Sequence, residues 1–100
     1  MRTVYKYQLA LNVDGVQMLS IPIGAKIVHC MLQGQTPCIW ADIDTEKTEQ
    51  ELREFIIVAT GQSLDPYKYA DLYHVASIHT LAGEFVFHVF ELEAQLYPRD

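Results

Sequence analysis

The amino-acid sequence predicts an all-β fold: a small antiparallel sandwich or barrel of about seven strands, with at most one short helix. Apolar and polar residues alternate along residues 3–11, which is typical of a half-exposed antiparallel strand. Residues 55–60 form an apolar, β-branched run, which favours a buried strand. Short segments with glycine or proline separate the apolar runs and predict turns between strands.

Four strands are predicted in the first half of the chain, at residues 3–11, 16–21, 25–33 and 38–43. The Asp14-Gly15 pair supplies the positive-φ position of the first turn. Pro22 lacks a backbone donor and Gly24 allows a bend, so together they break the ladder before the third strand. In the fourth strand, Trp40 and Asp42 are expected on the face opposite Ile39, Ala41 and Ile43.

The second half begins with a charged segment, residues 44–51, which is predicted to be a loop that runs into a strand. A helix over residues 48–55 is the main alternative. Residues 61–72 contain Gly61, Asp65 and Pro66 and are predicted to be an irregular loop. A final hairpin spans residues 74–92 and turns at residues 81–84. Residues 93–100 are expected to form a polar tail of the single domain, residues 1–100.

The second strand of this hairpin is apolar on both faces. Phe87 and Val89 share one face, and His88 and Phe90 share the other, so we expect protein to cover both sides. His74 and His79 are separated by an odd number of residues, which would place them on opposite sides of a regular strand.

Half of the residues are apolar and 20% are charged, so a single core leaves apolar surface that we expect to be buried in a homo-oligomer. The net charge of −6 argues against binding a nucleic acid polymer, which requires a basic surface. No apolar run reaches the length of a membrane span, and the first residues lack the apolar core of a signal peptide, so we expect a cytoplasmic protein that binds no membrane. Cys30 and Cys38 are expected to be two half-buried free thiols.

No motif for catalysis is present. The four histidines lack zinc-binding spacing, no serine or cysteine lies in a nucleophile motif, and no glycine-rich phosphate loop occurs. Most carboxylates lie in the charged loop, where exposure to solvent explains them; Asp42, in an apolar strand, is the exception. We therefore expect no enzyme activity, no metal and no cofactor. A hydrolase with His88 and Asp42 as an acid–base pair is the least favoured hypothesis.

Aromatic and basic residues point instead to binding of a small molecule. Aromatic rings stack on planar bases, and arginine or lysine contacts phosphate. Core packing is the competing interpretation for most of these aromatic residues, and for His88. The residues that we expect to bind the ligand are Trp40, Tyr7, Tyr67 and Tyr69 by stacking, Arg53 and Lys6 through phosphate, and His88, Thr60 and Gly61 by hydrogen bonds or loop closure.

Five segments together resemble a small family of uncharacterised domains that is common in phages and prophages. They are YKYQL, SIPIGAKIV, CIWADID, VATGQ and FVFHVFE, and the resemblance covers residues 3–91 except the loop at residues 65–72. It implies a phage origin and a β-rich fold, and it implies no established enzyme activity. Small phage proteins of this kind include anti-defence sponges, which sequester nucleotide immune signals as compact homo-oligomers.

The leading hypothesis is therefore a phage-encoded protein that sequesters a cyclic dinucleotide or an ADP-ribose-type signal and so inhibits host anti-phage defence. The alternative is an interaction or structural module that binds another protein through the tyrosine-containing loop or an exposed sheet edge.

Overall fold

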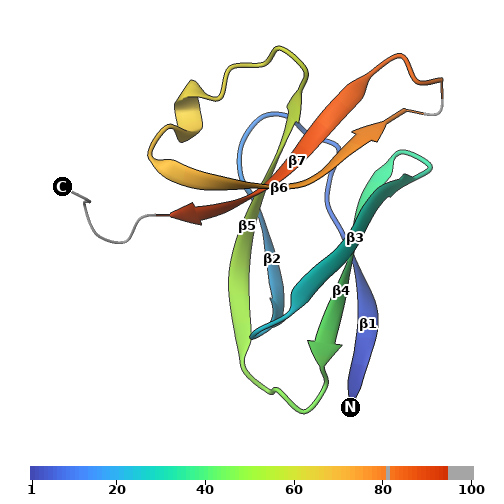
Figure 1. The fold of residues 1–100 in the computed structure, drawn as a ribbon, viewed down its shortest axis with the longest axis vertical. Coiled ribbons are helices and arrows are strands. Elements are labelled where there is room, and N and C mark those ends of the chain that lie inside the picture. Colours follow the sequence, from blue (N-terminus) through green and yellow to red (C-terminus); the bar gives the residue numbers. More distant parts are fainter. Residues whose placement is uncertain (81, 95–100) are drawn as a thin grey trace.

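Seven strands and one short 3-10 helix make up the part of the chain that the computed structural model describes, residues 1–80 and 82–94 (Figure 1). The strands are β1 (Arg2–Gln8), β2 (Gln17–Pro22), β3 (Lys26–Gln33), β4 (Thr36–Asp44), β5 (Gln50–Ala59), β6 (Ala70–His79) and β7 (Val86–Ala94). The 3-10 helix, η1, spans Asp65–Tyr67. The all-β prediction is confirmed.

The strands form two antiparallel sheets that are not closed into a barrel. The three-stranded sheet has the order β1-β4-β3, and the four-stranded sheet has the order β2-β5-β7-β6. Consecutive strands pair as hairpins only in β3–β4 and β6–β7. Gly15 has the predicted positive φ of 111°, but the strands on either side of this turn belong to different sheets, because β1 pairs with β4 and β2 pairs with β5.

The core lies between the inner faces of the two sheets. Alternation in β4 places Ile39, Ala41 and Ile43 inside and leaves Trp40 and Asp42 on the outer face, as predicted. Two clusters of buried side chains fill the space. The first contains Leu9, Cys30, Ile39, Phe55, Ile57, Ile78 and Val89, and the second contains Ile21, Ala25, Ala41 and Ile43.

The charged segment before β5 is a loop, and the alternative helix over residues 48–55 is wrong, because β5 begins at Gln50. Phe55 and Ile57 are fully buried in the core, and Ile56 and Val58 are buried on the other face of the same strand. These four consecutive residues are β-branched or aromatic, which suits a central strand whose two faces are both buried. A helix would leave some of the four side chains exposed.

The irregular loop is shorter than predicted. It includes η1, and β6 already begins at Ala70, so Leu72 and Tyr73 belong to a strand. The predicted polar tail begins inside β7, which continues to Ala94; residues 95–100 lie outside the described residues. Leu81, the first residue of the predicted hairpin turn, also lies outside them.

Two β-bulges change which side chains share a face. In β3 the register shifts at Val28, and in β6 it shifts at Val75. The expectation that His74 and His79 face opposite sides is wrong, because the extra residue in β6 turns both toward the outer face.

The molecule is wide and thin, with Cα extents of 42 × 41 × 16 Å. The outer faces of the two sheets carry many exposed side chains, although Ile56 and Val58 on β5 are buried there. The predicted cover on both sides of β7 is incomplete in one chain: Val89 is fully buried, whereas His88 and Phe90 are half-buried. Within residues 1–80 and 82–94, no helix is long and apolar enough to cross a membrane.

Candidate functional site

One row of side chains crosses the outer face of the three-stranded sheet from edge to edge. Lys6 on β1 lies directly opposite Trp40 on β4, and Trp40 lies directly opposite His29 on β3. The His29 and Trp40 rings are 5.5 Å apart between centroids and tilted by 46°. Trp40 is half-buried, whereas Lys6 and His29 are exposed. The Lys6 ammonium donates to the amide oxygen Oε1 of Gln33 at 2.9 Å, so its charge has a neutral partner.

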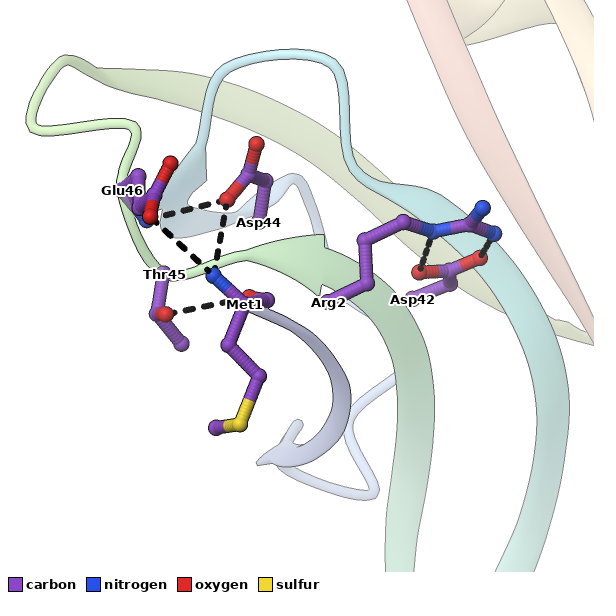
Figure 2. Close-up of polar contacts among 6 residues, drawn as sticks. All are labelled: Met1, Arg2, Asp42, Asp44, Thr45 and Glu46. Atoms are coloured by element: carbon purple, nitrogen blue, oxygen red, sulfur yellow. Dashed lines mark hydrogen bonds and ion pairs between the residues drawn. The ribbon is translucent and has the colours of Figure 1, made fainter.

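The next row on this face contains Val4, Asp42 and Lys26. Figure 2 shows the Arg2 guanidinium lying against the Asp42 carboxylate, with Nε 3.2 Å from Oδ1 and Nη2 2.5 Å from Oδ2. A hollow of about 220 Å³ opens beside this row, and its lining includes three basic residues, Arg2, Lys26 and Lys47. The same lining contains two carboxylates, Asp42 and Asp44, so three basic residues leave one net positive charge there.

Hydrogen bonding fixes the protonation states at this end of the sheet. The side-chain hydrogen bond from Arg2 is the largest cause that lowers the pKa of Asp42, and the same bond raises the pKa of Arg2. Asp44 has a lowered pKa, first because it accepts from the backbone N–H of Glu46, and the amino group of Met1 lies 3.5 Å from its Oδ1 (Figure 2). Both aspartates are therefore anionic at neutral pH and neutralise nearby cations.

Thr60 and His88, two further predicted site residues, lie on the outer face of the other sheet. Thr60 Oγ1 is 2.7 Å from His88 Nε2, and it also donates to the carbonyl oxygen of Val86 at 3.3 Å. His88 Nδ1 is 2.8 Å from Ser77 Oγ, which is 3.0 Å from His74 Nε2. One orientation satisfies every member: His74 donates to Ser77, Ser77 to His88, His88 to Thr60, and Thr60 to Val86.

Both ring nitrogens of His88 are therefore hydrogen-bonded to other side chains of the protein. His88 and Asp42 also project from the outer faces of different sheets, so the structure does not bring together the acid–base pair of the hydrolase hypothesis. The same separation divides His88 and Thr60 from Trp40 and Lys6. The predicted ligand-binding residues therefore do not converge on one pocket of a single chain.

Arg53 is part of an ion pair inside the fold. Its Nε and Nη2 donate to the two carboxylate oxygens of Glu91 at 2.5 and 2.7 Å, and Nη1 donates to the carbonyl oxygen of Ala25 at 2.5 Å. The hydrogen bond to Glu91 is the largest cause that raises the pKa of Arg53. Because Ala25 precedes β3 and Glu91 lies in β7, Arg53 joins the two sheets and has little capacity left for a phosphate.

The remaining predicted residues are scattered. Tyr7 faces the core, where it packs beside the second cluster and burial raises its pKa. Tyr67 is half-buried at the end of η1, and Tyr69 is 79% exposed with the Lys68 ammonium 5.1 Å from its ring centroid. Gly61 has a φ of 89° at the turn after β5, a conformation that favours glycine.

A family model for a domain of unknown function, DUF7352, matches residues 1–98. The chain belongs to the DUF7352 family. No curated protein sequence and no solved structure gives a significant match to it.

Sequence reasoning missed three residues of the outer face of this DUF7352 chain: His29, Lys26 and Lys47. Lys26 and His29 are separated by an odd number of residues, so a regular strand would send them to opposite sides. The bulge at Val28 puts both on the face of Trp40. A bulge of this kind leaves no reliable signal in one sequence, and Lys47 joins the hollow only through the loop after β4.

The cysteines of this DUF7352 chain are free, as predicted, but they are buried rather than half-buried. They project from opposite faces of the sheet: Cys30 lies in the core, and Cys38 lies beneath Gln33 on the outer side. Burial raises the pKa of Cys30 to about 11. Among the residues that the structure describes, no group of three or more His, Cys, Asp or Glu side chains is placed to hold a metal ion.

Proposed function

We propose that this protein binds a nucleotide-derived small molecule on the outer face of the three-stranded sheet and sequesters it without chemical change. In this proposal the protein is phage-encoded and acts in the host cytoplasm. The ligand is a cyclic dinucleotide or an ADP-ribose-type immune signal, and its removal inhibits host anti-phage defence.

The observation that carries the proposal is the Lys6–Trp40–His29 row. Neighbouring strands are about 4.8 Å apart, so a base stacked on the half-buried indole of Trp40 would lie within reach of the Lys6 ammonium on one side and the His29 ring on the other. Among aromatic side chains, tryptophan makes the strongest cation–π contacts, and its large flat ring can also stack on a planar base. A nucleotide has a planar base and a negatively charged phosphate, so an aromatic ring beside a cation without an ion-pair partner suits both parts of it.

The phosphate would extend into the hollow beside the row. Arg2, Lys26 and Lys47 line it together with Asp42 and Asp44, so the hollow carries one net positive charge although the chain carries −6. Lysine and arginine contacts to phosphate are charge-assisted and stronger than neutral hydrogen bonds. This face therefore offers such a ligand an aromatic ring for the base and lysines for the phosphate.

Fluorescence of Trp40, the single tryptophan in the chain, is the direct test. Purified protein is titrated with cyclic dinucleotides, cyclic ADP-ribose and linear ADP-ribose conjugates, and each compound is also tested by thermal shift. Stacking on the indole quenches its emission. A ligand at 100 times its Kd adds about 2.7 kcal/mol to the folded state, which raises Tm by on the order of 10 °C in a domain of this size.

Calorimetry on variants then locates the site. Lys26→Gln and Lys47→Gln are expected to weaken binding by about tenfold each, because each removes one phosphate contact, and Lys6→Gln should weaken it because it removes the cation beside Trp40. Lys68→Gln, which removes a lysine from the loop after β5, is the matched control and should bind as the wild type does. Heating the complex and weighing the released ligand should recover it unchanged. A panel without quenching or thermal shift, or a ligand released as product, would overturn the proposal.

A further inference from the structure

We infer that the open edge of β1 is a dimerisation edge: β1 of a second copy of this chain pairs with it antiparallel, across a two-fold axis at Tyr5. The pairing joins two three-stranded sheets into one sheet of order β3-β4-β1-β1-β4-β3. Ligand binding at Trp40 is not required for it.

The edge of β1 presents a row of backbone groups to solvent, because among the described residues β1 pairs with β4 alone (Figure 1). At one end of the strand the N–H of Thr45 donates to the carbonyl oxygen of Met1. At the other end the N–H of Leu9 donates to the carbonyl oxygen of Pro37. Since the direction of the backbone groups alternates along an antiparallel strand, the odd-numbered residues bond β4. The outward N–H and C=O groups belong to Arg2, Val4, Lys6 and Gln8.

The other three sheet edges are each obstructed. β3 and β6 both carry a bulge, and they lie beside each other where the two sheets meet. On β2, the N–H of Ile23 donates to Glu49, so Pro22 stands on the outward side of the strand, where it offers no donor. β1 has no proline and keeps one unbroken register with β4 over all seven residues. A straight edge of this kind is a template for another strand.

Charged side chains often protect an edge strand, and β1 carries two, Arg2 and Lys6. Both reach back over the sheet instead. Figure 2 shows the Arg2 guanidinium turned onto the Asp42 carboxylate of β4. The Lys6 ammonium crosses β4 and donates to Gln33 on β3. Neither cation therefore blocks a second strand that approaches from the open side.

The charge pattern selects the occupant and its register. With the axis at Tyr5, Arg2 lies opposite Gln8 of the second copy and Val4 lies opposite Lys6, so each cation faces an uncharged residue. An axis at Val4 would set Arg2 opposite Lys6, and an axis at Lys6 would set that lysine against itself. Like charges directly opposite are unfavourable. The axis at Tyr5 is also the register that pairs all seven residues of β1, and this self-complementarity favours a second copy over an unrelated strand.

Two further features support this register. Tyr5 is 50% exposed on one chain and would lie against Tyr5 of the second copy, and aromatic cross-strand pairs stabilise a sheet. Because Lys6 lies opposite Val4, the row that contains Trp40 in one copy continues into the row that contains Asp42 in the other. The two outer faces thus become one surface.

Sedimentation velocity from micromolar to millimolar protein tests the pairing. We expect a monomer that becomes a dimer as concentration rises. Val4→Pro removes an outward N–H without removing a bond to β4, so it should abolish the dimer. Ser20→Pro is the matched control, because it removes an outward N–H from the edge of β2, and it should dimerise as the wild type does.

A charge exchange at Tyr5 tests the axis itself. Tyr5→Lys and Tyr5→Glu each set like charges against each other at the axis, so each variant alone should be monomeric. An equimolar mixture should restore the dimer, because opposite charges then meet. Thermal unfolding followed by circular dichroism establishes that both variants are folded, and this pair of variants keeps the test decisive if Val4→Pro does not fold.

Amide hydrogen exchange gives a residue-by-residue readout. The amides of Val4, Lys6 and Gln8 should exchange more slowly as protein concentration rises, whereas those of Met18 and Ser20, on the outward side of β2, should not change. A monomer at every concentration would overturn the inference. A dimer that survives in Tyr5→Lys, or one that is lost equally in Ser20→Pro, would also overturn it, since another surface would then join the copies. A mixture of the two Tyr5 variants that stays monomeric would contradict the assigned axis.

Discussion

Arg53 and Glu91 form a two-point ion pair across β5 and β7, and the third nitrogen of the same guanidinium reaches the carbonyl oxygen of Ala25 beside β3. Both side chains are about four-fifths buried. One residue thereby connects the four-stranded sheet to the start of the three-stranded sheet. The arginine that sequence composition suggests for phosphate binding is a structural connection instead.

Removing one partner of this pair should destabilise the fold. Arg53→Met leaves the largely buried Glu91 carboxylate without its cation, which is expected to lower the free energy of unfolding by about 3–5 kcal/mol. Replacing both, Arg53→Met with Glu91→Leu, should recover most of the loss because no charge is left unpaired. Urea unfolding of the two single variants and the double variant measures the coupling. Additive losses would show that the pair does not act as a unit.

Asp42 should titrate at an unusually low pH. Its pKa lies below the ordinary 3.8 because Arg2 donates to it, so the pair stabilises the folded chain above that value, and the contribution is lost as pH falls through the folded-state pKa. In Arg2→Gln the pKa should return toward 3.8. Carboxyl-carbon NMR during acid titration measures both. An unchanged titration in Arg2→Gln would show that Arg2 does not hold this carboxylate in solution.

The buried thiols should resist alkylation. Cys30 has a pKa raised to about 11 by burial, so it presents little thiolate at neutral pH, and the Cys38 side chain has no exposed surface for the reagent to reach. Iodoacetamide should modify both rapidly in urea and only slowly in the native protein, as mass spectrometry over time would record. Since only the unfolded chain ionises Cys30 near pH 9, stability should also decline above that pH. Rapid labelling of Cys30 in the native protein would show that the two sheets separate readily.

Truncating two side chains of β5 should change the free energy of unfolding by very different amounts. Phe55 is fully buried in the core, and Phe55→Ala is expected to cost about 3–5 kcal/mol through lost burial and a cavity. Leu52 lies on the outer face, and Leu52→Ala should change stability by less than about 0.5 kcal/mol. Thermal and urea unfolding compare them. A large loss in Leu52→Ala would indicate that another subunit covers the outer face.

The orientation of the hydrogen-bond chain predicts the tautomer of His88. Because the Thr60 hydroxyl donates to Val86, neutral His88 must carry its proton on Nε2 and accept from Ser77 at Nδ1. Nitrogen-15 NMR of the imidazole distinguishes the tautomers directly. Thr60→Val should cost about 1 kcal/mol and release this preference, whereas Ser63→Ala, in the loop after β5, serves as a control. A proton on Nδ1 would reverse the assigned direction.

The fold class and the faces of β4 could be predicted because alternation, β-branched runs and glycine turns are local signals. Which strands pair could not be predicted. The Asp14-Gly15 turn looks like a hairpin turn, yet β1 and β2 each pair with a strand far along the chain. The candidate site was predictable only in part. Trp40 and Lys6 were identified, but His29 and Lys26 depend on a bulge, and the partner of Arg53 depends on tertiary contacts.

The interleaved order of the strands has a consequence for how the protein is made. β1 and β2 leave the ribosome first, but each needs a partner that is synthesised about 30 residues later, β4 for one and β5 for the other. All strands of the three-stranded sheet have been made once β4 is complete, but the four-stranded sheet must wait for β5, β6 and β7, and the core between the two sheets forms only then. We therefore expect a slow, late and all-or-none folding reaction. A nascent chain stalled before β5 would expose β2 without a partner strand, together with the uncovered inner face of the three-stranded sheet, to aggregation.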